Sequence, residues 1–302
     1  MGYRETTSDP NPLTDEQAIE RYRYLLQTAP PDDIERAHEE AFAKLTPEQR
    51  RTVLNRLAEF VPATEVRGDD PASLARTATR AELREPGTTL GHDSIYDGNS
   101  YMLAAAVRRA GAIAYRVGIV PDEPRAFLDA LGDQLVRADV VITTGGVSMG
   151  DYDVVKEALT PSGTVWFGGV AMQPGKPQGF GVVGEDEIPI FTLPGNPVSS
   201  FISFEMFVLP ALRRMMGRLP YARPTVEATL THGVTSPAGR AQYLRGELDS
   251  ADERVTVSPV GGPGSHLVGD LAQANALIVV PTDTTSLDAG ATVTVVPLDR
   301  EF

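Results

Sequence analysis

Two adjacent glycines followed by two carboxylates stand near the middle of the chain, in Thr143-Thr144-Gly145-Gly146-Val147-Ser148-Met149-Gly150-Asp151-Tyr152-Asp153. Glycines let backbone N–H groups approach an anion closely, and the start of a helix favours negative charge. Ser148 adds a hydroxyl donor, and Asp153 is the best choice for a Mg²⁺ ion that bridges to phosphate. The simpler interpretation is an ordinary strand-to-helix turn, whose dipole stabilises both carboxylates.

Two further loops combine proline with polar residues. In Gln173-Pro174-Gly175-Lys176-Pro177 the prolines and glycine predict a tight turn that presents Lys176 to an oxyanion or phosphate. In Leu193-Pro194-Gly195-Asn196-Pro197-Val198-Ser199, Asn196 suits an N-cap and Pro197 a first helical residue. Each loop has a simpler interpretation: a surface lysine in the first, and an ordinary helix start in the second.

A fourth segment, Ile95-Tyr96-Asp97-Gly98-Asn99-Ser100, precedes a predicted helix. Asn99 or Ser100 suits the cap of that helix, and Asp97 could instead face the site.

Helix and strand patterns alternate after Gly91. Apolar periodicity predicts helices over 99–110, 124–138, 151–159 and 197–216, and strands over 112–120, 139–144, 164–171 and 188–193. This order indicates an α/β domain with a mostly parallel sheet covered on both faces. Loops at the carboxyl edge of such a sheet form its ligand site, so we expect the rigid loops to converge there. Trp166 lies in an apolar run and is predicted to be core.

The two ends of the chain have different patterns. Short alternating segments over 225–231, 242–248, 254–259, 276–280 and 292–296 predict a small β-sandwich or barrel. Residues 1–61 are predicted to be helical, with Thr46-Pro47-Glu48-Gln49 as a capping box and His38 on a solvated face. The expected domain bounds are 1–61, a linker over 62–81, an α/β domain over 82–221, and a β domain over 222–302.

Composition narrows the class of protein. The 302 residues carry a net charge of -14 and no cysteine, which excludes disulfides, cysteine metal sites and thiol nucleophiles. An acidic chain lacks the basic footprint that nucleic acids and anionic membranes require. Any phosphate would be held by backbone N–H groups and a few local cations. We expect a cytoplasmic protein that binds neither nucleic acid nor membrane.

Taken together, the four loop segments closely resemble the molybdopterin molybdenumtransferases, the family to which the C-terminal region of gephyrin belongs. The segments 239–245, 264–267 and 272–281 resemble that family's C-terminal β domain. The resemblance runs from about Glu82 to the end of the chain. It implies a MoaB/Mog-like doubly wound sheet, a small C-terminal β-barrel and a homodimer.

The resemblance also implies a reaction in molybdenum cofactor biosynthesis. The family takes molybdate and adenylylated molybdopterin, with a divalent cation such as Mg²⁺, and releases AMP. By position, Asp153, Lys176, Pro194 and Pro197 are the implied catalytic residues, with Asp153 also the metal ligand. The implied substrate-binding residues are Asp97, Thr144, Gly145, Gly146, Val147, Ser148, Gly150, Gly175, Gly195 and Asn196. Arg240 and Arg245 are either strand-surface arginines or reach a neighbouring subunit's site.

The chain departs from the family pattern before Glu82. The family's sheet domain begins with an apolar strand, but Leu74 to Ala81 is Leu-Ala-Arg-Thr-Ala-Thr-Arg-Ala, and Ala81 replaces an aspartate. A first central strand is thus predicted to be missing, unless a segment from before Glu82 fills the gap. Two other functions stay open: a catalytically impaired molybdopterin-binding or scaffolding protein, and a molybdopterin adenylyltransferase.

Overall fold

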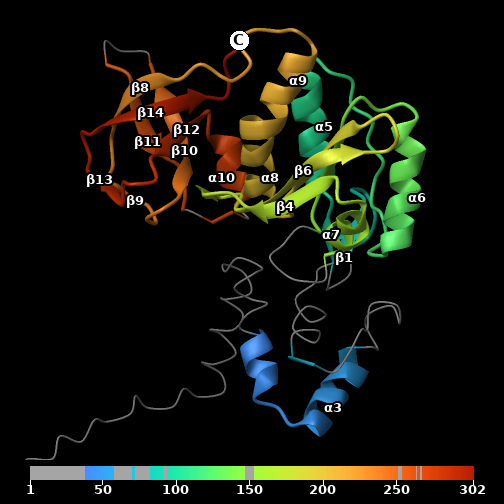
Figure 1. Cartoon of the computed structure of the whole chain (residues 1–302). Helices are drawn as coiled ribbons and strands as arrows, with labels where there is room; N and C mark the ends of the chain where they lie inside the picture. Colours follow the sequence, from blue (N-terminus) through green and yellow to red (C-terminus); the bar gives the residue numbers. More distant parts are fainter. Residues whose placement is uncertain are drawn as a thin grey trace, which may run out of the picture. The chain divides into compact units, whose positions relative to one another are not determined.

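A computed structural model describes residues 38–57, 70–71, 82–90, 94–146, 153–250, 254–262, 264–265 and 267–302 (Figure 1). The chain divides into two compact units, Met1–Arg80 and Ala81–Phe302. The predicted bounds of the domains inside the second unit stay a prediction. Among the described residues, no helix has the length and apolar character needed to cross a membrane.

In the first unit, helix α3 spans Pro47–Leu57. Its predicted capping box is confirmed: the Gln49 N–H donates to Thr46 Oγ1 at 3.2 Å, and the Thr46 N–H donates to Gln49 Oε1 at 2.9 Å. The prediction that His38 lies on a solvated face is wrong. His38 is buried and stacks on Phe42, and burial lowers the pKa of its imidazole.

The second unit contains a four-stranded sheet in the order β3-β7-β6-β4. Strand β3 spans Val141–Thr144, β7 spans Ile188–Leu193, β6 spans Pro177–Val183 and β4 spans Val165–Gly169. Strands β3 and β7 are parallel, whereas β6 runs antiparallel to both of its neighbours. The α/β class is confirmed. The described sheet is mixed because β6 runs antiparallel to its neighbours. Strand β6 itself was not anticipated, since its sequence contains glycines.

Strand β7 is buried on both faces because its residues alternate between two cores. Ile190 packs with helices α6 (Pro124–Leu135) and α7 (Val154–Leu159). Phe191 and Leu193 pack with α5 (Asn99–Arg109) and with the long helix that follows β7. Helices therefore cover both faces of the sheet, as the continuous apolar run of β7 predicts.

The long helix contains a π-helical turn. It consists of α8 (Pro197–Ser203), the π turn Phe204–Val208 and α9 (Leu209–Met215). The turn holds Glu205, whose buried carboxylate pairs with Arg223 Nε at 2.6 Å. One continuous apolar helix was predicted here, and the ends of the helix agree closely.

The segment 112–120 was predicted to be a buried strand, and this prediction is wrong. It pairs with no described strand, and Ile113 and Tyr115 are 79% and 64% exposed. Strand β3 is also at the edge of the sheet, with β7 as its one neighbour among the described strands. Residues 72–81, which stand where the family pattern has its first strand, lie outside the described residues. The loss of that strand, and its replacement by a segment from before Glu82, therefore both stay predictions.

Two short strands precede α5 and form a separate sheet. Strand β1 (Glu82–Arg84) pairs in parallel with β2 (Ser94–Tyr96).

At the β4 edge of the four-stranded sheet, the prediction of a core Trp166 is wrong, since this residue is 54% exposed. It lies opposite Phe180, which is also exposed, while its neighbours Val165 and Phe167 point into the core.

The C-terminal part is a closed barrel, as predicted. Its strands follow one another in the order β11-β8-β14-β12-β10, and a pairing between β10 and β11 closes it. The strands are β8 (Val226–Leu230), β10 (Ala241–Asp249), β11 (Thr256–Pro259), β12 (Ala276–Val280) and β14 (Thr292–Pro297). Two short strands outside the barrel, β9 (Val234–Thr235) and β13 (Ser286–Leu287), pair with each other. Helix α10 (Val268–Gln273) was not anticipated.

The barrel and the α/β sheet share structure. Strand β5 (Met172–Gln173) comes from the α/β part of the chain, yet it pairs in parallel with β10 of the barrel. A common core joins Val198 and Ile202 of α8 with Leu277 and Val296 of the barrel. Figure 1 shows the orange and red barrel strands beside α8 and α10.

Candidate functional site

The hydroxyl of Thr144 joins two of the predicted site loops. Thr144 ends β3, and its Oγ1 donates to the Pro194 carbonyl at 3.0 Å. The same oxygen accepts the Asn99 amide at 2.9 Å and lies 3.1 Å from Ser200 Oγ. A hydroxyl has one donor and two acceptor positions, so these three contacts saturate it. The ends of β3 and β7 are thereby fixed to each other.

Backbone packing brings the same loops into contact. The Gly145 N–H donates to the Leu193 carbonyl at 3.0 Å. A Cβ on Gly195 would lie 3.5 Å from Gly145 Cα. Gly145 and Gly146 both have positive φ, and a Cβ on Gly146 would lie 2.8 Å from Val155 of α7. Glycine is therefore required at Gly146 by conformation and by space. The Gly145 N–H is already used, so it is not free for an anion.

Asn99 bridges both loops from the first turn of α5. Its Nδ2 donates to Thr144 Oγ1 and, at 2.6 Å, to the Gly195 carbonyl. The sequence had suggested only a capping role for Asn99. The N-cap residue of α5 is Gly98, and Asp97 just before it accepts the Ser100 N–H through Oδ1 at 3.0 Å. Asn99 is thus free to connect three segments that are far apart in the sequence.

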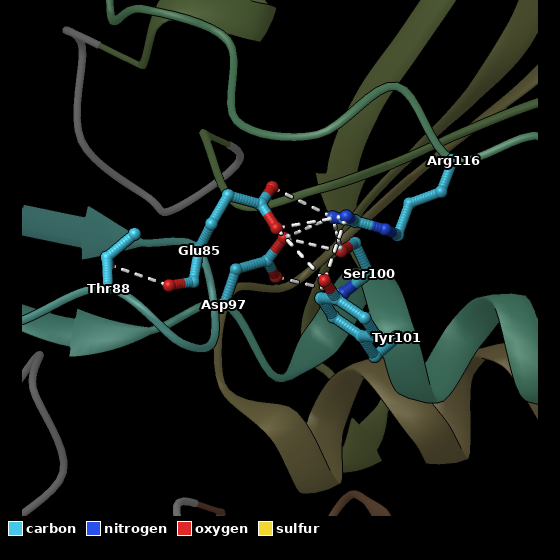
Figure 2. A network of polar contacts seen from close by, with 6 residues as sticks. All are labelled: Glu85, Thr88, Asp97, Ser100, Tyr101 and Arg116. Carbon is cyan, nitrogen blue, oxygen red and sulfur yellow. Dashed lines mark hydrogen bonds and ion pairs between the residues drawn. The ribbon is translucent and has the colours of Figure 1, made fainter.

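Asp97 is held by a cluster of polar side chains (Figure 2). It is 5% exposed, its Oδ2 accepts the Ser100 hydroxyl, and it lies 3.7 Å from Arg116 Nη1. Arg116 makes two bonds of 2.9 Å to Glu85, one from each terminal nitrogen, and stacks over the Tyr101 ring at 4.0 Å. The Asp97 carboxylate is therefore engaged in the fold, and its contact with a ligand stays a prediction.

Hydrogen bonding and desolvation shift the pKa values of the side chains in this cluster. The hydrogen bond from Arg116 lowers the pKa of Glu85, and the same bond raises the pKa of Arg116. Desolvation, with a hydrogen bond to Glu85, raises the pKa of Tyr101. Because Glu85 follows β1 and Arg116 lies in the 112–120 segment, the pair ties these two parts of the chain to α5.

The lysine loop lies between β5 and β6. Its Gly175 is buried and has a φ of 103°. The Gly175 carbonyl accepts the Gln178 amide at 2.7 Å, and the Lys176 carbonyl accepts the Val170 N–H at 2.7 Å. The Lys176 side chain is exposed. The predicted tight turn is present, with a solvent-accessible ammonium at its tip.

The third loop is fixed to the barrel. Asn196 Nδ2 donates to Ser265 Oγ at 2.9 Å, and the Val198 N–H donates to the Ser265 carbonyl at 3.0 Å. Pro194 is buried, and Pro197 begins α8 as predicted. Arg245 is buried rather than on a strand surface; its guanidinium donates to the Gly262 and Gly264 carbonyls of the Ser265 loop. Burial lowers the pKa of Arg245.

The remaining predicted site residues follow β3. Asp153 is half-buried and is the N-cap residue of α7 by backbone position. Val147, Ser148 and Gly150 lie outside the described residues. In the part of the chain that the structure describes, no group of three or more histidines and carboxylates is placed to hold a metal ion.

Two residues that sequence reasoning missed are Ser200 and Ser265. Ser200 is fully buried in α8 and contacts Thr144, and Ser265 contacts the loop that starts this helix. A serine in an apolar helix resembles any other buried small residue. The available signal was that Ser200 follows Asn196 by four residues and Pro197 by three, which places it on the first turn of the helix beside the loop.

The α/β part of the chain and the barrel each match a known sequence family. Residues 86–214 match the family described as the probable molybdopterin binding domain, and residues 227–298 match the MoeA C-terminal region (domain IV). The chain therefore belongs to the molybdopterin molybdenumtransferase family.

Individual relatives agree with this assignment. The chain is 45% identical over 219 residues to molybdopterin molybdenumtransferase 2 of Mycobacterium tuberculosis, with 70% of this chain and 53% of that protein covered. It is 36% identical over 199 residues to gephyrin of Dictyostelium discoideum, with 59% and 28% covered. The structure of a MoeA protein from Pyrococcus horikoshii matches with a TM-score of 0.63 and 29% identity, with 73% and 53% covered. The chain spans about half the length of the molybdenumtransferases it matches.

Proposed function

We propose that this protein transfers molybdenum from molybdate to adenylylated molybdopterin and releases AMP. The observation that carries the proposal is the hydrogen-bonded junction of the loops at Thr144, Asn99 and Gly195. The loops after β3 and β7 meet at one edge of the sheet, where α/β proteins bind their ligands. The match of 227–298 to the MoeA C-terminal region favours this reaction over adenylyl transfer.

The residues have distinct roles in the proposed reaction. Lys176 would pair with a phosphate or molybdate oxygen, because its ammonium is exposed at the tip of a fixed turn. Gly146 and the residues after it would offer backbone N–H groups to the phosphates. Rigid placement of both reactants contributes to the rate because it removes rotational and translational freedom before the reaction.

A Mg²⁺ ion would be held mainly by the substrate. Magnesium commonly takes one or two protein carboxylates and completes its shell with phosphate oxygens and water. Asp153 supplies one such carboxylate beside the glycine loop, which fits this mode of binding, whereas the described residues offer no larger set of ligands. When bound, the ion would neutralise charge on the phosphoanhydride.

AMP release from adenylylated molybdopterin, measured by chromatography with and without molybdate, tests the proposal. We expect molybdate-dependent AMP release that Lys176→Ala reduces about 100- to 1000-fold, since loss of one electrostatic contact to the reacting group typically has that effect. Binding is measured in parallel by calorimetry with the same compound. A wild-type chain that neither binds the compound nor releases AMP would contradict the proposal.

A binding or scaffolding role without turnover is the second candidate. The observation that favours it is the unpaired 112–120 segment beside a sheet that ends at β3 in the described residues. Such a sheet would keep the loops of the proposed site yet hold the reactants less firmly. Binding of adenylylated molybdopterin without AMP release would identify this role. Both candidate functions include a homodimer and a cytoplasmic location. Sedimentation of the purified chain tests the homodimer.

A further inference from the structure

Both peptide carbonyl groups that flank the Lys176 backbone accept a hydrogen bond. One is the Gly175 carbonyl, which accepts the Gln178 side-chain amide at 2.7 Å. The other is the Lys176 carbonyl, which accepts the Val170 N–H at 2.7 Å. Peptide units are planar, so fixing the units on both sides leaves the Lys176 backbone little freedom to rotate. The exposed Lys176 side chain therefore extends from a backbone segment whose position is fixed.

Gln178 is in turn anchored to helix α8. Its side chain is 6% exposed, and Nε2 lies 2.5 Å from the hydroxyl of Ser203, which is fully buried. A Cβ on Gly175 would lie 2.8 Å from Ser203 Oγ and 3.3 Å from Gln178 Nε2. The turn, the strand and the helix therefore meet with no space for another atom.

Helix α8 also carries the contact to the glycine loop. Ser200 and Ser203 are three residues apart, so they lie on the same face of the helix. Ser200 Oγ is 3.1 Å from Thr144 Oγ1 at the end of β3. The helix itself begins at Pro197, directly after the third loop. One buried face of α8 thus sets the spacing of Lys176 relative to the other two loops.

We propose that Gln178 is a positioning residue of the molybdenum-transfer site. It acts through Lys176: its amide holds the Gly175 carbonyl and the Ser203 hydroxyl together, and so fixes the lysine turn against α8. The inference rests on the proposed function for the chemistry that Lys176 performs. Gln178 itself is buried beneath the turn.

The decisive test is a double-mutant cycle on AMP release. Gln178→Met keeps the length of the side chain and removes its donor. We expect kcat/KM to fall about 10- to 100-fold, as displacement of a reacting group by about 1 Å can cause. In a Lys176→Ala background the same substitution should change the rate by less than about twofold, because residues that act as a unit are not additive. Ser236→Ala, which removes a buried hydroxyl beside Thr285 and away from the lysine turn, is the control for loss of a buried polar group.

An equal fall in both backgrounds would overturn the proposal, because Gln178 would then act through general stability. An unchanged rate in Gln178→Met would overturn it as well. Ser203→Ala provides a second variant that leaves the bond to Gly175 in place. It should show a smaller fall that also disappears in the Lys176→Ala background.

Amide hydrogen exchange separates this inference from the proposed function, because it needs no turnover. In the full chain, Gln178→Met should speed exchange at the Val170 N–H, which bonds to Lys176. It should leave the Gly145 N–H, which bonds to Leu193, unchanged. If the wild-type chain releases no AMP, the proposed function fails, and hydrogen exchange then tests the role of Gln178 by itself. Unchanged exchange at the Val170 N–H in Gln178→Met would show that Gln178 does not fix the lysine turn. Faster exchange would support that role.

Discussion

At the scale of single residues, the site depends on hydroxyl groups that differ in their hydrogen bonding. Thr144 uses its hydroxyl fully, in contacts with Asn99, Pro194 and Ser200. Thr192 is fully buried on β7, and its Oγ1 has no hydrogen-bond partner among the described residues. The same substitution at the two positions should therefore have opposite effects on stability.

Thr144→Val should destabilise the protein by about 1–3 kcal/mol, because it leaves the Pro194 carbonyl and the Asn99 amide without their shared partner. AMP release should also slow, since the loops after β3 and β7 lose the contact that joins them. Urea unfolding followed by circular dichroism measures the first effect and chromatography the second. Unchanged stability would show that water replaces these bonds at no cost.

Thr192→Val should be neutral or stabilising, by up to about 1–2 kcal/mol, because the new methyl group replaces an unpaired buried hydroxyl. A Cβ on Gly179 would lie 2.1 Å from the Thr192 hydroxyl, so this side chain already fills its space and valine has nearly the same shape. The same unfolding measurement checks it. Destabilisation comparable to that of Thr144→Val would contradict the assignment of an unpaired hydroxyl.

At the scale of elements, the long helix after β7 is held by an ion pair at its π turn. Glu205 and Arg223 are both buried, and Arg223 also stacks on the Phe302 ring at 4.8 Å. Arg213 stacks on the same ring at 4.2 Å. A π turn changes the direction of the residues after it, and here it is combined with a charge that must be paired inside the protein.

Arg223→Met should cost roughly 3–5 kcal/mol of stability, because it leaves the Glu205 carboxylate buried without its cation. Replacing both residues, as Glu205→Met with Arg223→Met, should recover most of this loss. Thermal unfolding of the three variants measures the comparison. A double variant no more stable than Arg223→Met would indicate that the stacking on Phe302, not the ion pair, carries the effect.

The Glu85–Arg116 pair attaches β1 to the 112–120 segment and should weaken in acid. Its hydrogen bond lowers the pKa of Glu85 below the ordinary value of 4.5. The stabilisation is therefore present above about pH 4.5 and is lost as pH falls through the lower, folded-state value. The Arg116 side-chain N–H signals in an NMR titration should shift over this range. Glu85→Gln should abolish the step, and a step that persists would assign it to another carboxylate.

At the scale of the whole molecule, one edge of the α/β sheet is open in the described residues. The 112–120 segment exposes every second side chain, including Ile113, Tyr115 and Val117, and it pairs with no described strand. Exposed backbone with alternating apolar side chains is a template for pairing with another chain. The net charge of -14 opposes such contact only at separations below about 8 Å at physiological salt, because repulsion between exposed charges that lie farther apart is largely screened.

We therefore expect the chain to self-associate through this edge. Ile113→Lys combined with Val117→Lys should shift light-scattering mass toward the smallest species, because a charge on the exposed face disfavours pairing. Leu219→Lys combined with Val268→Lys adds the same charge at two other exposed apolar residues and serves as the control. Equal effects of the two sets would mean that charge alone, rather than the edge, controls association.

The sequence predicted those elements whose apolar pattern is strong and continuous. Strand β7 and strand β12 were predicted at their observed ends, because both are nearly unbroken apolar runs. The closed barrel followed from short, regularly spaced strands. The convergence of loops at one sheet edge also followed from topology, although the contacts of Asn99 and Ser200 did not, because hydrogen bonds between distant segments have no local signal.

Each wrong prediction has its own physical cause. The 112–120 segment has the pattern of a buried strand, but a strand needs a neighbour to supply its hydrogen bonds, and pattern alone does not provide one. Trp166 is apolar by type, yet alternation on an edge strand turns it outward. Strand β6 was missed because its glycines lower strand propensity, although Gly179 and Gly181 leave room for Thr192 and for the backbone of β4.

The pairing of β5 with β10 has a consequence for how the chain can be divided. Met172 and Gln173 belong to one sequence family and their ladder partners Ala241 and Gln242 to the other. A fragment ending before Val226 would lose that ladder together with Leu277 and Val296, and would expose Val198 and Ile202. Strand β5, which precedes the lysine turn, would then have lost its pairing with β10. A chimera made from two relatives should therefore fold only when the barrel and residues 172–203 come from the same parent protein.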